Sequence, residues 1–225
     1  MISFFVAALM VVTNYQSVAK SNLPKGDEIL KRCLVSYDNA KTFQGEIKWD
    51  IGATPPIQII VNTKVENDGK GNVLRGVMSV QMSGAQSTHV QTIEDQMTDM
   101  YIDLDKKQFQ KRAHGPDKVS GLLNRTFANV MKFVGKFKVT VVSLNNRPTY
   151  KLYGDDGRIT STFWIDKQTY HFLSFSAVPR KESKQGKTEV RMVYQKFDEP
   201  IPDSTFSMTP PNGVTEMPST PAPTQ

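Results

Sequence analysis

The residues that could do chemistry are few, and they lie far apart in the sequence. The three histidines are His89, His114 and His171, and their spacing matches no arrangement of metal ligands. The sequence contains no Gly-x-Ser-x-Gly motif, no phosphate-binding loop and no Cys-x-x-Cys pair. We therefore predict no catalytic residue, no metal site and no cofactor, and we do not expect an enzyme.

The carboxylates that stand out have a simpler explanation than acid–base catalysis. Asp155 and Asp156 are adjacent, but they come directly before a glycine, as in a hairpin loop. Asp166 comes directly before Lys-Gln, where a carboxylate at a strand end can accept hydrogen bonds from turn amides. We predict turn-forming roles for all three.

The single cysteine, Cys33, cannot form an intramolecular disulfide. It shares a helical spacing with Leu30, Leu34 and Tyr37, which predicts a small side chain in the core.

Composition and charge favour a globular protein with an ordinary solvated surface. The 225 residues suffice for one large domain or two small ones, and 28 Lys and Arg against 22 Asp and Glu give a net charge of +6. The basic residues are spread along the chain, which argues against nucleic-acid binding. A mild attraction to anionic membrane surfaces is compatible with this charge.

The first residues indicate export. Residues 2–12 form an apolar run of the length of a signal-peptide core, too short to span a bilayer comfortably. Ser17-Val18-Ala19 follows, and we predict cleavage after Ala19. No Lys or Arg precedes the run, so an uncleaved anchor is the alternative.

The rest of the chain predicts mainly strands. Residues 27–40 fit an amphipathic helix, and the apolar period then changes from helical to alternating. The predicted strands cover residues 45–51, 57–65, 73–82, 87–93, 97–104, 107–112, 139–144, 149–153, 161–166, 172–177, 188–196 and a closing strand at 204–208. A second, strongly apolar helix is predicted over residues 117–135.

The order of these elements predicts an α+β fold that is mainly β. Strands do not alternate with helices, which argues against a parallel sheet. A single antiparallel sheet of this many strands must curl or split, and a curled sheet has a concave face that must be filled.

The end of the chain carries a family resemblance. The run Phe206-Ser207-Met208-Thr209-Pro210-Pro211-Asn212-Gly213-Val214 resembles the "Phe-x-Phe-x-Pro-Pro-x-Gly-Val" ending of the periplasmic lipoprotein carrier LolA and its relatives. Residues 95–104 and 163–166 resemble two further strands of that family, more weakly. The order of helix, strands, inserted helix and strands is also similar.

The resemblance implies a fold and a domain division. The fold is an unclosed antiparallel β half-barrel with a helical lid, LolA-like, over residues 20–214, between a signal peptide at 1–19 and a flexible tail rich in Pro and Thr at 215–225. LolA carries an Arg-Pro segment in an early strand, whose arginine bonds to the lid. This chain has no Arg-Pro there, and Arg75 is the nearest candidate for lid gating.

A half-barrel carrier binds its ligand by apolar packing, so its site consists of apolar residues. The candidates on the concave face and the lid are Ile57, Ile59, Val61, Met100, Ile102, Leu123, Phe127, Met131, Phe163, Ile165, Leu173, Phe175, Met192 and Tyr194. For each of them, ordinary core packing is the alternative. Ten methionines suit a cavity that accepts varied chains.

The resemblance implies an exported, periplasmic carrier that binds acyl chains or lipoproteins and moves them between membranes. Its partners would be the lipidated cargo and transient membrane-bound donor and acceptor proteins, with no nucleic acid, and the protein would be a monomer. The first alternative is an envelope sensor of the RseB-like type, which binds a membrane partner without lipid transfer. The second is a structural envelope protein with a fully packed core.

Overall fold

Alternating apolar and polar residues along most of the chain form the strands of one curved sheet. The computed structural model describes residues 23–70, 72–84, 87–114, 137–180 and 186–218. The strands are β1 (Thr42–Ile51), β2 (Ile57–Asn67), β3 (Val73–Ser83), β4 (Thr88–Asp95), β5 (Thr98–Asp103), β6 (Gln108–Ala113), β7 (Lys138–Leu144), β8 (Arg147–Asp155), β9 (Ile159–Asp166), β10 (Phe172–Pro179), β11 (Thr188–Phe197) and β12 (Thr215–Glu216).

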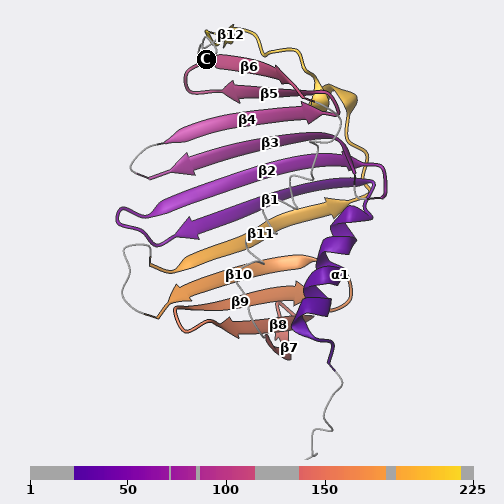
Figure 1. Ribbon diagram of the computed structural model, residues 1–225, viewed down its shortest axis with the longest axis vertical. Coiled ribbons are helices and arrows are strands. Elements are labelled where there is room, and N and C mark those ends of the chain that lie inside the picture. The colour runs from indigo at the N-terminus through magenta and orange to yellow at the C-terminus, as the bar shows by residue number, and fades with distance from the viewer. Residues whose placement is uncertain (1–22, 71, 85–86, 115–136, 181–185, 219–225) are drawn as a thin grey trace, which may run out of the picture.

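The sheet has twelve strands in the order β12-β6-β5-β4-β3-β2-β1-β11-β10-β9-β8-β7. Its two edges do not pair with each other, so the curved sheet is an unclosed half-barrel (Figure 1). Neighbours pair antiparallel except β12 and β6, which are parallel. The half-barrel predicted from the sequence is confirmed.

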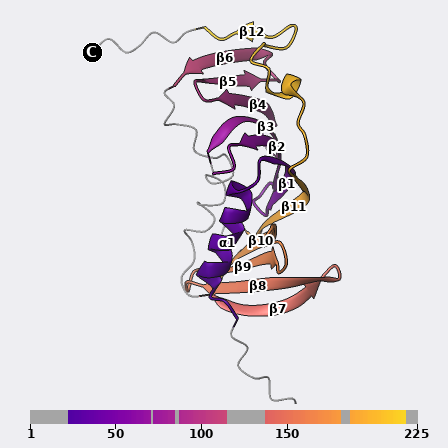
Figure 2. The ribbon, with the colours of Figure 1, turned by 90° about the vertical axis from the view of Figure 1, so that its right-hand side faces the viewer.

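One helix, α1 (Gly26–Asp38), lies against one face of the sheet, as the side view shows (Figure 2). Asp27 and Glu28 favour its start because acidic side chains stabilise the positive end of a helix. Its buried residues include Ile29, Leu30 and Cys33, at helical spacing. The second predicted helix, residues 117–135, lies outside the described residues.

Local sequence explains the tight turns. Asn145 and Asn146 join β7 to β8 with φ of 51° and 62°, the left-handed values that a two-residue hairpin turn requires and that asparagine tolerates. Asp166 accepts hydrogen bonds from the backbone N–H groups of Gln168 (2.8 Å) and Thr169 (2.9 Å), the turn role predicted for it.

The end of the chain differs from the prediction. Residues 204–208 form no strand; a 3-10 helix, η2 (Asp203–Phe206), occupies most of this stretch, and the final strand is β12. Pro200 and Pro202 precede η2 and lack the N–H group that ladder pairing needs. The segment instead crosses the face of the sheet opposite α1, where Phe206 is only 7% exposed.

Two apolar clusters therefore stabilise the sheet, one on each face. The first joins α1 to β1 and β8–β11 and includes Phe43, Leu152 and Phe163. The second lies on the other face and joins Phe206 to residues of β3, β4 and β5, including Met100. We call the face that α1 covers the inner face and the opposite one the outer face.

Phe206 is the apolar anchor of the C-terminal segment, so we predict that Phe206→Ala lowers the free energy of unfolding by about 3 kcal/mol. Urea unfolding followed by circular dichroism measures this loss. Ser204→Ala, in the same 3-10 turn but exposed, is the control and is expected to change the free energy by less than about 0.5 kcal/mol. Equal effects of the two variants would contradict the anchoring role.

Candidate functional site: the inner face of the half-barrel

The strand register decides which side chains face α1. Residues directly opposite each other in neighbouring strands point to the same face of a sheet. Ile47, which packs in the cluster with α1, lies opposite Val61; Val61 lies opposite Val80, and Val80 opposite Val90. This row places the alternate residues of β1–β4 on the inner face.

Under α1, the inner face is tightly closed. Phe43, Phe163 and Ile165 are 0–1% exposed there. Tyr37 of α1 donates a hydrogen bond to Gln195 Oε1 (2.9 Å) and accepts one from the N–H of Phe172 (3.3 Å), which ties the helix to β10 and β11. This part of the face is a packed core.

The residues that end the helix are fixed as well. Asn67 Nδ2 donates to the carbonyl oxygens of Ala40 (3.0 Å) and Tyr37 (3.5 Å), so the end of β2 holds the turn that follows α1. The Asn67 side chain is buried, which makes these bonds costly to break.

Beyond α1, the inner face carries a continuous apolar band. Unlike the core beneath the helix, all of its side chains are partly exposed. The apolar band consists of Trp49 and Ile51 of β1, Ile57, Ile59 and Val61 of β2, Met78, Val80 and Met82 of β3, and Val90 of β4. A continuous apolar surface of this kind is suited to packing against an apolar ligand.

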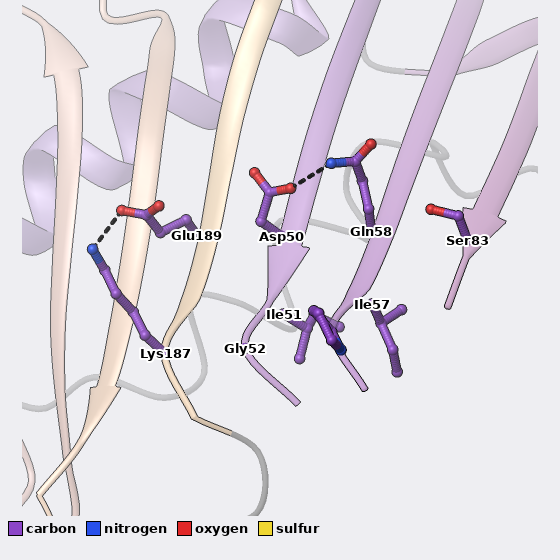
Figure 3. A pocket seen from close by; sticks show the side chains of 9 residues that line it. Asp50, Ile51, Gly52, Ile57, Gln58, Ser83, Lys187 and Glu189 are labelled. Atoms are coloured by element: carbon purple, nitrogen blue, oxygen red, sulfur yellow. Dashed lines mark hydrogen bonds and ion pairs between the residues drawn. The ribbon is translucent and has the colours of Figure 1, made fainter. Parts of the chain in front are cut away.

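A pocket of about 440 Å³ lies at the end of β1 and the start of β2 (Figure 3). Ile51 and Ile57 of the band line it, but Asp50, Gln58, Ser83 and Glu189 belong to the outer-face rows. Gln58 Nε2 donates to Asp50 Oδ1 (2.8 Å), and Lys187 pairs with Glu189 (2.6 Å). The Asp50, Gln58 and Glu189 side chains therefore lie on the outer side of the sheet, opposite the band.

Asp50 stays ionised at this pocket. Burial alone would raise its pKa, but hydrogen bonds from Gln58 and Arg191 hold the pKa below its ordinary value. The Arg191 guanidinium lies 2.9 Å from Asp50 Oδ2. The pocket therefore contains a fixed carboxylate and amide at neutral pH, on the face opposite the band.

Trp49 adds one polar group within the band. Its Nε1–H is buried and has no hydrogen-bond acceptor among the described residues. A buried donor without an acceptor is costly. Because the Nε1 atom itself is buried, it is a feature of the packing against the α1 core and not a contact point for a ligand.

The structure brings together part of the predicted site. Seven of the predicted residues face inward, and Leu123, Phe127 and Met131 lie outside the described residues. The inward residues are Ile57, Ile59, Val61 and Met192, which are partly exposed, and Phe163, Ile165 and Phe175, which are buried near α1.

Four predicted residues lie elsewhere. Met100 and Ile102 are 0% exposed in the outer cluster with Phe206, because their register row is that of Val77 and not of Val80. Tyr194 and Leu173 line a pocket on the outer side.

Arg75, the predicted gating residue, also lies on the outer face. It pairs with Glu66 (2.6 Å) and Asp203 (2.5 Å), and its guanidinium lies 4.4 Å from the centre of the Phe206 ring. The described contacts of Arg75 therefore hold the C-terminal segment to the sheet.

The sequence prediction omitted several members of the band: Trp49, Ile51, Met78, Val80, Met82 and Val90. For Met78, Val80 and Met82 the sequence does contain a pattern that predicts a shared strand face, because they alternate with polar Ser79 and Gln81. What the pattern could not tell is which of the two faces each alternating set occupies.

Two of the three histidines make local contacts with polar side chains. His89 Nε2 lies 3.2 Å from Ser79 Oγ, and His114 lies 3.0 Å from Asp99. Within residues 23–70, 72–84, 87–114, 137–180 and 186–218, no group of three or more His, Cys, Asp or Glu side chains could hold a metal ion. No helix within these ranges has the length and apolarity needed to span a membrane.

Comparison with known proteins gives one family match and several similar solved structures. Residues 122–218 match a family described as "Predicted periplasmic protein (DUF2092)". No curated protein matches the sequence. Both the family description and the half-barrel agree with the LolA-like, periplasmic protein that the sequence predicts.

Among solved structures, an uncharacterized conserved protein from Thermus thermophilus is similar over 85% of this chain and 97% of its own, with a TM-score of 0.51 and 13% identity. This likeness supports the fold alone. MucB of Pseudomonas aeruginosa, in complex with MucA, aligns over 81% of this chain and 60% of its own (TM-score 0.47, 12% identity). A LolA superfamily protein from Nitrosomonas europaea aligns over 82% and 98% (TM-score 0.34, 10% identity).

The packing beneath α1 predicts a loss of stability at alkaline pH. Burial raises the pKa of the Cys33 thiol from 9.0 to about 12 and also raises the pKa of Tyr37. The unfolded thiol ionises first, so stabilisation is complete below about pH 9 and is lost as pH rises toward 12.

Urea unfolding between pH 7 and pH 10 tests this expectation. The free energy of unfolding should be nearly constant at the lower end and fall above about pH 9, with a smaller slope in Cys33→Ala. An identical slope in the two proteins would show that Cys33 is not the source. The native thiol should also resist a thiol reagent that labels the unfolded chain.

Proposed function

We propose that this protein is a non-enzymatic carrier that binds the acyl chains of lipids or lipoproteins on the inner face of its half-barrel, in the periplasm. The observation that carries the proposal is the apolar band beyond α1, whose side chains are partly exposed although they lie in the middle of the sheet. Leu123, Phe127 and Met131 remain proposed lid residues.

The physical need for such a surface is large. Each methylene removed from water contributes about 0.8 kcal/mol, so one sixteen-carbon chain is worth roughly 12 kcal/mol. A protein that moves this chain through an aqueous compartment must offer a comparable apolar surface. Packing against side chains of four strands supplies it without specific polar contacts, which agrees with the lack of a catalytic motif in the sequence.

An acyl chain on the inner face would lie along Ile57 and Ile59 of the band. The polar side chains of Asp50 and Gln58 belong to the outer-face rows, so the proposed site selects its ligand by apolar packing.

The two tryptophans provide a direct binding assay. Trp49 lies in the band, whereas Trp164 lies on the outer face, since it is opposite Ser174 and Lys151. In Trp164→Phe, a bound acyl chain should change the fluorescence of Trp49. In Trp49→Phe, the same ligand should leave the fluorescence of Trp164 unchanged.

With this assay, we predict that Ile59→Asn weakens acyl binding about tenfold or more, because it places a polar group in the band. Ile60→Asn is the matched control: the same change at the adjacent residue, which is partly exposed on the outer face. Both variants are compared in the Trp164→Phe background. Equal binding by the two variants, or no binding by the parent, would contradict the carrier and leave the RseB-like interaction module as the better account.

A further inference from the structure

The outer face has its own irregular feature, which the proposed carrier function does not use. The register of β11 against β1 shifts at Val193, and the register of β10 against β9 shifts at Leu173. Each shift leaves one extra residue outside the ladder, in two strands that pair with each other. Such bulges change the direction of side chains and are common next to functional sites.

The two bulges border a pocket of about 620 Å³. Its other wall comes from the end of the β7–β8 hairpin, which projects past the sheet on the side away from α1 (Figure 2). The lining residues are Leu144, Asn145, Arg147, Leu173, Ser174, Arg191, Met192, Val193, Tyr194 and Gln195. They include two arginines and no carboxylate.

Large apolar side chains are exposed around this pocket. Val193 is 55% and Tyr194 41% exposed, and Tyr153 (39%) and Val178 (40%) lie farther along the outer face. Four of the eight large apolar side chains that are exposed in the described residues therefore belong to the outer side of β8–β11. Isolated exposure is common, but a group on one face marks an interaction surface.

Cations accompany these side chains. Arg147 lies near Asp166: burial alone would raise the pKa of that carboxyl, but turn hydrogen bonds and Arg147 hold it below its ordinary value. Lys151 lies on the same face opposite Trp164, and Lys48 lies directly opposite Arg191 in the register. Arg191 pairs with Asp50 but remains 57% exposed.

Carboxylates also lie on this face. Glu189 and Asp50 are paired with Lys187 and Arg191, and Glu46 lies opposite Tyr194. The pocket itself contains only cations among its charged groups, so its charge complements an anion.

We propose that the outer face of β8–β11 docks on an anionic phospholipid bilayer. A lipid phosphate would occupy the pocket between Arg147 and Arg191, since guanidinium groups bind phosphate with two parallel hydrogen bonds. Val193 and Tyr194 would enter the interfacial layer, where aromatic side chains are favoured. The proposal does not depend on acyl binding, because it uses the opposite face of the sheet.

The test is co-sedimentation of the exported protein with vesicles of phosphatidylcholine alone or mixed with phosphatidylglycerol. All variants are purified with the same N-terminus, so any contribution of residues 1–22 to vesicle binding is the same in each. We expect binding only to the mixed vesicles, with affinity falling as salt is added. The double variant Arg147→Gln/Lys151→Gln should bind about twenty-fold more weakly.

The matched control is Lys64→Gln/Lys111→Gln, which removes the same charge from the other half of the outer face. It should retain most of the binding, and an equal loss in the two double variants would overturn the proposal, since only net charge would then matter. Equal binding to both vesicle compositions would overturn it as well.

Tyr194→Asp separates a bilayer from a single bound anion. It should weaken vesicle binding if the side chain enters the interface. Unchanged vesicle binding by Tyr194→Asp, together with full competition by inorganic phosphate, would show an anion site only and reject bilayer docking. The Trp49 assay, read in parallel in every variant, distinguishes failure of docking from failure of acyl binding.

Discussion

A helix of 13 residues cannot cover a sheet of twelve strands, and this mismatch governs the rest of the structure. The helix is about 20 Å long, whereas twelve strands extend roughly 50 Å across the sheet. Helix α1 can therefore bury only the part of the inner face around Phe43, Phe163 and Phe175. Within the described residues, the apolar band beyond α1 stays partly exposed, and we propose above that an acyl chain covers it.

The outer face is likewise covered only in part. Around β3, β4 and β5, the C-terminal segment covers it, with Phe206 packed into the second cluster and Arg75 held by Glu66 and Asp203. Around β8–β11, it carries exposed apolar side chains and cations. We propose that the inner face of this sheet binds an acyl chain. We also propose that the outer face of β8–β11 docks on a bilayer.

Most of the fold could be predicted from the sequence because antiparallel strands with short turns have local signals. The helix at Gly26–Asp38 and the hairpin turn at Asn145 and Asn146 are examples. The closing strand could not be predicted, since Phe206 and Met208 alternate as in a strand but pack as the anchor of a crossing segment. Local pattern does not distinguish these two uses of the same residues.

The site was predictable only in part, for a related reason. Alternation groups residues into two sets, but it does not state which set faces α1. The sequence predicts Ile57, Ile59 and Val61 on the inner face, and the register places them there. It predicts Met100 and Ile102 there too, yet their row belongs to the outer cluster, where Val77 and Ile93 lie in the neighbouring strands. That distinction requires the pairing of strands that are distant in sequence.

The central claim is that the inner face binds acyl chains, and native mass spectrometry tests it most directly. The protein is purified from the periplasm of a two-membrane host without detergent and is measured before and after extraction with organic solvent. The account predicts adducts of lipid mass that disappear on extraction and return when an acyl lipid is added. A protein that is bare as purified and takes up no lipid would contradict it.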